Sequence, residues 1–160
     1  ILKFILFFLV GISFCSNLQV SQSKIIHSNI SAEELDLGYS LADYNFTSPL
    51  EIRVESDHTW DLYLQSKDLN LMSNNGEISI QKVQWKRSSD NDAAYRPISY
   101  ERTWIGSSHQ YKDGIVELNF RMILDWSTYP GEYSVPIEFI VEDKPSLSRK
   151  RKLIKTKKIR

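Results

Sequence analysis

The chain has 160 residues, of which 41% are hydrophobic, with one cysteine and six glycines. This composition supports a packed core and excludes an internal disulfide, and no glycine-rich phosphate-binding loop is present. The formal net charge is zero, because 20 Lys and Arg balance 20 Asp and Glu, but the two signs are unevenly distributed.

The first fifteen residues have the pattern of a secretory signal peptide. Lys3 precedes the apolar run 4–12, and small side chains follow at Ser13 and Cys15. The run is shorter than the about 20 residues of a membrane-spanning helix. We expect a signal-peptide helix over 1–15, cleaved after Cys15. In the alternative reading Cys15 is lipidated and retained, although bulky Phe14 fits that reading poorly.

The remaining chain is predicted to comprise three parts. Residues 16–31 are rich in Ser, Asn and Gln and are expected to form a flexible linker; 32–144 are expected to form one domain; and 145–160 are expected to form a basic tail. From residue 16 to 144 there are 11 Lys and Arg against 20 Asp and Glu, a balance of −9. The tail has eight basic residues and no acidic one.

Alternation of apolar and polar residues predicts β-strands throughout the domain. A weak strand is expected over 35–41. Stronger alternation covers 50–55 and 60–64, and the polar turn 56–59 between them predicts a β-hairpin. The run 78–85 changes phase between Ile80 and Val83, which predicts one β-bulge residue. A strand interrupted by Pro97 is expected over 95–104.

The clearest alternation lies late in the chain. Every second residue from Val116 to Trp126 is apolar, and the same holds from Tyr133 to Val141, after the turn 129–131. These runs predict an antiparallel pair with one face toward solvent. About seven short strands separated by turns predict an all-β, immunoglobulin-like antiparallel β-sandwich.

Two regions resemble small secreted β-sandwich domains of bacterial surface and pilin-like proteins. The first is 50–64, with Val54-x-Ser56 and Trp60-x-Leu62-x-Leu64. The second is 126–141, with Trp126 upstream of Pro130-Gly131-x-Tyr133. The resemblance is architectural and covers 35–141. It implies an extracytoplasmic structural or adhesive module without catalytic residues.

The sequence carries no evident catalytic, metal-binding or cofactor-binding constellation. His27, His58 and His109 lie in separate segments without neighbouring cysteines, so no metal site is predicted. No serine lies in a nucleophile elbow. We therefore expect a protein that is not an enzyme and has no cofactor.

Aromatic residues offer one candidate ligand site. Trp60, Trp85 and Trp126 lie on the apolar phase of their runs and are expected in the core. Trp104 lies beside polar segments together with three tyrosines, and this candidate ligand-binding cluster consists of Trp104, Tyr95, Tyr100 and Tyr111. The polar segments 86–94 and 106–114 are expected to be flexible loops where a ligand would be sought first.

The basic tail offers a second candidate, a contact for anionic polymers or lipids. Its residues are Arg149, Lys150, Arg151, Lys152, Lys155, Lys157, Lys158 and Arg160. A disordered, solvated end is the simpler reading.

The sequence is compatible with two functions. The first is a non-enzymatic module, secreted, periplasmic or on the cell surface, that acts in surface structure, assembly or adhesion through its sheet edges and loops. Its expected partners are other surface or periplasmic proteins, bound by strand addition. The second is a carbohydrate-binding module with an aromatic platform around Trp104. A glycan or an anionic envelope polymer is a further expected partner, and nucleic acid is not.

Overall fold

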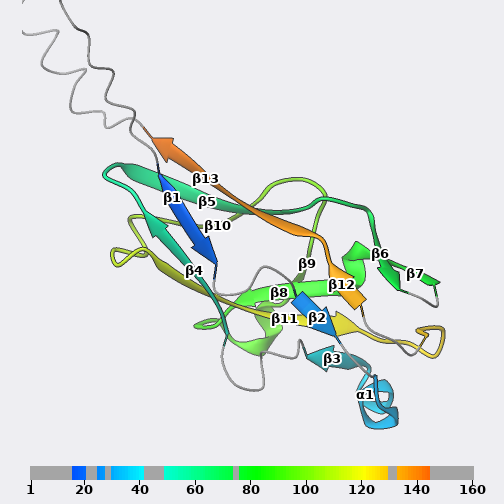
Figure 1. Ribbon diagram of the computed structural model, residues 1–160. Helices are drawn as coiled ribbons and strands as arrows, with labels where there is room; N and C mark the ends of the chain where they lie inside the picture. Colours follow the sequence, from blue (N-terminus) through cyan, green and yellow to red (C-terminus); the bar gives the residue numbers. More distant parts are fainter. Residues whose placement is uncertain are drawn as a thin grey trace, which may run out of the picture.

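The computed structural model describes residues 16–20, 25–27, 30–41, 49–73, 76–129 and 133–144. They form an all-β protein made of antiparallel sheets, with a single short α-helix in the described part (Figure 1). The signal peptide predicted over 1–15 and the tail 145–160 lie outside the described residues. No helix among the described residues is long and apolar enough to cross a membrane.

The first half of the described chain contains β1 (Asn17–Val20), β2 (Ile25–His27), α1 (Ala32–Leu37), β3 (Tyr39–Leu41), β4 (Leu50–Glu55), β5 (Thr59–Ser66), β6 (Asn70–Ser73) and β7 (Gly76–Ser79). The second half contains the 3-10 turn η2 (Ile80–Lys82), β8 (Val83–Arg87), the 3-10 turn η3 (Asp92–Ala94), β9 (Arg96–Pro97), β10 (Thr103–Ser107), β11 (Ile115–Ile123), β12 (Tyr133–Val135) and β13 (Ile137–Lys144).

Two larger sheets carry most of the strands. The first has the order β1-β4-β11-β8-β9, with β3 also paired to β11. The second has the order β10-β5-β13. Two small two-stranded sheets, β12-β2 and β6-β7, complete the described structure.

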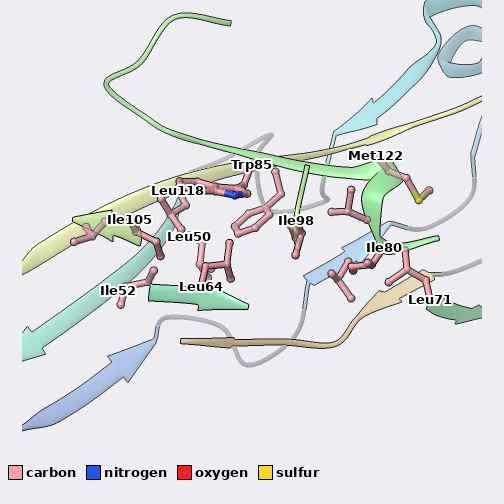
Figure 2. Packing of buried hydrophobic residues seen from close by; sticks show 14 of the residues in the cluster. Leu50, Ile52, Leu64, Leu71, Ile80, Trp85, Ile98, Ile105, Leu118 and Met122 are labelled. Atoms are coloured by element: carbon pink, nitrogen blue, oxygen red, sulfur yellow. The ribbon is translucent and has the colours of Figure 1, made fainter. Parts of the chain in front are cut away.

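The buried apolar side chains of both larger sheets join in one core cluster (Figure 2). Trp85 from β8 and Leu118 from β11 are fully buried, as is Leu64 from β5. Alternation places these residues on the inner faces, because successive side chains of a strand point to opposite sides of the sheet. The core positions predicted for Trp60 and Trp85 are thus confirmed.

The predicted strand partners were wrong in two cases. The runs 50–55 and 60–64 do not form a hairpin, because β4 pairs with β1 and β11 whereas β5 pairs with β10 and β13. The late runs are also separate: β11 lies in the first sheet and β13 in the second. The alternation of apolar and polar residues indicates which face of a strand is buried. It does not indicate the strand's partner, because two strands of one hairpin and two strands of different sheets can show the same alternation.

Local structure differs from the prediction at three places. Of the weak strand expected over 35–41, residues 39–41 form β3, but residues 35–37 belong to α1, which Ser31 and Glu34 begin with a reciprocal capping box. The phase change after Ile80 comes from η2 rather than from a β-bulge. The expected linker 16–31 contains β1, paired along its length with β4, and β2, paired with β12.

Trp126 corrects a core prediction, because its side chain is 83% exposed. β11 ends at Ile123, and Asp125 then organises a turn by accepting hydrogen bonds from the backbone N–H and the hydroxyl of Ser127. The strand period no longer applies beyond Leu124. The expected loops are also shorter than predicted, because Lys86 and Arg87 belong to β8 and Gly106 and Ser107 to β10.

Candidate functional site: the free edge of β13

β13 is the longest strand at an edge of the two larger sheets. It has eight residues and pairs with β5 along its whole length, from Ile137 opposite Ser66 to Lys144 opposite Thr59. Among the described residues, no strand pairs with its other side (Figure 1). Within this part of the chain, its outer row of backbone N–H and C=O groups is open to an added strand.

The hydrogen-bond alternation identifies the backbone groups of this free edge. The N–H of Lys67 donates to the carbonyl of Pro136 at 2.7 Å, which makes these two residues a hydrogen-bonded pair. In an antiparallel ladder such pairs alternate with non-bonded pairs. Glu138, Ile140 and Glu142 therefore bond to β5. The backbone groups of Ile137, Phe139 and Val141 point away from β5.

The inner side of the free edge is an incompletely covered part of the core. Ile137, Phe139 and Val141 pack against the core cluster but are only half-buried. Two residues of β1, Leu18 and Val20, have the same status. We call these five side chains the apolar seam. A strand that paired with β13 would cover part of this seam.

One end of the β13 edge is occupied by the chain itself. The Asp143 carboxylate accepts hydrogen bonds from the hydroxyls of Ser16, just before β1, and Ser56, just after β4. These contacts bring the start of β1 to the end of β13. The open stretch is therefore limited to Ile137–Val141.

The opposite edge of the same sheet is protected. β10 is the edge strand there, and its outward carbonyl at Ile105 accepts a hydrogen bond from Arg87 Nε at 2.7 Å. A charged side chain laid across an edge strand is a common way to block further strand pairing. In the larger sheet the edge strands β1 and β9 have only four and two residues. β13 therefore offers the longest pairing edge.

The outer face of the sheet at β13 carries carboxylates, two of which are ion-paired. Glu138 accepts a hydrogen bond from Gln65 of β5, and Glu142 forms an ion pair with Arg102. Nearby, buried Asp61 pairs with Lys144, and the hydrogen bond to Asp61 raises the pKa of Lys144. Burial raises the pKa of Tyr63, as do the charges of Asp61 and Glu142. An added strand would face carboxylates on this side.

The structure gives Trp104 a different neighbour from those predicted. Trp104 is 39% exposed and lies directly opposite Tyr63 of β5, which in turn lies opposite Ile140 of β13. The guanidinium carbon of Arg87 lies 5.3 Å from the centre of the Trp104 ring. Sequence reasoning missed Tyr63 and Arg87, because only strand register brings them to Trp104.

Tyr111 packs inward, at the edge of the core cluster. Its ring occupies the space that a side chain at position 106 would need: a Cβ on Gly106 would lie 2.6 Å from a ring carbon. Burial raises the pKa of Tyr111, while the nearby charge of Arg87 lowers it by less. Tyr111 also lines an open hollow of about 640 Å³ together with Gln110 and Glu117.

The other two predicted aromatics lie at different hollows. Tyr100 is 57% exposed and borders a depression with Leu69 and Glu77. Tyr95 lines a smaller hollow on the outer face of the six-stranded sheet. The four predicted residues therefore share no single hollow. The candidate polymer-contact residues, from Arg149 to Arg160, lie outside the described residues.

Comparison with known proteins adds no identification. No protein family model, no curated protein and no solved structure matches this chain. Within the described ranges, no group of three or more His, Cys, Asp or Glu side chains is arranged to hold a metal ion.

Proposed function

We propose that this protein is a non-enzymatic β-sandwich module of immunoglobulin-like type, secreted or displayed on a cell surface, that takes part in surface assembly by strand addition at β13. One observation carries the proposal: the unpaired edge Ile137–Val141 contributes three side chains to the half-buried apolar seam. Strand addition supplies main-chain hydrogen bonds, and side chains at alternate positions supply specificity. The leader-like pattern 1–15 supports the location outside the cytoplasm.

The chemistry of β13 defines the partner strand. On the inner side its residues must be apolar, because they would cover Phe139 and Val141. On the outer side they would lie beside Glu138, which has no ion-pair partner among the described residues, so Lys or Arg is favoured there. The expected partner is an extended segment of another polypeptide in which apolar and basic residues alternate.

A second copy of β13 fits this edge poorly. An antiparallel pair of two β13 strands centred on Ile140 would place Glu138 opposite Glu142 twice. Like charges directly opposite each other destabilise a strand pair. In this register the edge therefore disfavours self-association.

Two proline variants test the proposal. Val141→Pro removes an outward N–H, which a solvent-facing edge tolerates, whereas Glu142→Pro removes an N–H bonded to β5. Binding of an eight-residue peptide of alternating valine and lysine would be measured by isothermal titration calorimetry, with thermal melting for stability. We expect Val141→Pro to retain its melting temperature within a few degrees but to lose peptide binding. Glu142→Pro should have a much lower melting temperature, because it loses a hydrogen bond to β5.

Two controls complete the experiment. A peptide of alternating valine and glutamate should bind far more weakly than the lysine peptide, because it would face like charges. In hydrogen exchange, the amides of Phe139 and Val141 should exchange rapidly in the free protein and become protected with the lysine peptide bound. Undiminished binding by Val141→Pro would rule out this edge as the docking site.

A further inference from the structure

A small hollow on the outer face of the six-stranded sheet collects cationic and aromatic side chains. Its volume is about 230 Å³. Its polar and aromatic lining consists of Tyr39, Lys86, Asp92, Tyr95, Asn119 and Arg121. The proposed function in strand addition makes no use of this face.

Strand register brings these residues together. Arg121 of β11 lies opposite Gln84 of β8, and Asn119 lies opposite Lys86. All four alternate with inward core residues and therefore point outward from the same sheet face. Tyr39 comes from β3, which pairs with the end of β11, and Tyr95 follows η3.

Arg121 is held in a fixed position at this hollow. Its Nε donates to Gln84 Oε1 at 2.8 Å, and its guanidinium carbon lies 4.1 Å from the ring centre of Tyr95 and 5.5 Å from that of Tyr39. Among the described residues no acid forms an ion pair with Arg121. Within that part of the chain, its two terminal nitrogens present a planar fork of donors, the geometry that matches carboxylate and sulfate groups.

Lys86 contributes a second, more deeply buried cation. Its side chain is only 11% exposed, and its Nζ donates to the carbonyl of Asp90 at 2.8 Å and pairs with Asp92 at 3.0 Å. The Asp92 side chain is 88% exposed, so it lies at the rim. Lys86 Nζ also lies 5.4 Å from the centre of the Tyr95 ring, and the third ammonium N–H has no acceptor among the described residues. The hollow thus has two cations and one acid, although residues 16–144 as a whole have a net charge of −9.

The neutral groups of the hollow are also predominantly donors. The Asn119 side-chain oxygen accepts a hydrogen bond from the Ser88 hydroxyl, which leaves its amide N–H groups for the hollow. Burial raises the pKa of Tyr95, although Arg121 opposes the rise, so its hydroxyl stays protonated and can donate. A ligand here must supply acceptors.

We propose that this hollow binds the carboxylate or sulfate group of an acidic sugar, with Arg121 as the principal contact. The guanidinium fork holds two oxygens of the anionic group, and Lys86 and Asn119 supply the remaining donors. The tyrosines provide the apolar and hydroxyl contacts that a sugar ring accepts. The volume admits one such unit.

The experiment compares ligands that differ by one group. Purified wild-type protein would be titrated with methyl glucuronide, methyl glucoside, glucose 6-sulfate and inorganic sulfate, by calorimetry and by the NMR signal of the Arg121 side-chain N–H. We expect either acidic sugar to bind at least about tenfold more tightly than methyl glucoside, since a hydrogen bond to a charged group is worth this much. Equal affinity for glucuronide and glucoside would overturn the proposal. So would inorganic sulfate that binds as tightly as the acidic sugars.

Three variants localise the effect. Arg121→Gln should weaken binding of the acidic sugars about tenfold or more. Asn119→Asp keeps the shape and the oxygen that accepts from Ser88, but adds a negative charge to the hollow, and should abolish binding even if Arg121→Gln is too unstable to test. Arg53→Gln is the matched control, because Arg53 is an exposed arginine of β4 paired with Glu51. Equal weakening by Arg53→Gln would contradict the assignment. None of these variants touches β13, so the two proposals fail independently.

Discussion

Gly114 shows how one residue joins the loop before β11 to β4. Its φ is +73°, and a Cβ added there would lie 2.3 Å from the carbonyl oxygen of Val54. Its own carbonyl accepts a hydrogen bond from the Val54 N–H at 2.8 Å. The backbone of β4 therefore leaves no room for a side chain at this position.

Gly114→Ala is expected to destabilise the protein by at least about 2 kcal/mol. Alanine is strained in the left-handed conformation, and its Cβ would also clash with the carbonyl oxygen of Val54. Gly38→Ala is the matched control: its φ is +77°, yet nothing lies within 4 Å of an added Cβ. It should cost only about 1 kcal/mol. Urea unfolding measures both values, and equal losses would mean that the contact with Val54 relaxes freely.

Two strands with the same alternating pattern differ in how completely they are buried. On β11, Phe120 is fully buried, because this strand has neighbours on both sides. On β13, Ile137 is only half-buried, because the strand lies at an edge. The sequence patterns of the two strands do not reveal this difference.

Phe120→Ala is therefore expected to lower the free energy of unfolding by about 3–5 kcal/mol, as large-to-small changes in a closed core do. Ile137→Ala should cost only about 1 kcal/mol. Chemical denaturation of both variants tests this order. An Ile137 variant as unstable as the Phe120 variant would show that β13 is more enclosed than its half-exposed side chains indicate.

Much of the candidate site depends on strand pairing that could not be predicted from the sequence. The alternation of 133–141 predicted a strand, and residues 137–141 belong to β13. Its partner, β5, lies more than seventy residues earlier in the chain. The ladder that turns the backbone of Phe139 outward follows from that partner. Likewise, Arg121 meets Tyr95 only because the chain after β8 returns toward β11. The capping box Ser31-x-x-Glu34 was a readable signal for α1 that strand alternation obscured.

On the scale of the whole molecule, charge is segregated. The segment 16–144 has a balance of −9, and the eight basic residues of 145–160 follow it. We expect the chain from Ser16 to Arg160 to bind anionic vesicles at low ionic strength, and deletion of 146–160 to abolish this binding. Salt near 0.5 M should also abolish it, because the screening length falls to about 4 Å. Vesicle co-sedimentation measures the effect, and equal binding by the truncated chain would assign the tail no role in it.

The sequence alone determined the class of structure and most of the core. Period-two alternation names the buried face of a strand, so Trp85, Leu118 and Phe120 could be placed in the core before any partner was known. Strand partners, the free edge of β13 and the hollow around Arg121 were decided by tertiary structure. These features depend on which distant segments lie side by side, and the local pattern is identical for a strand with one neighbour and a strand with two.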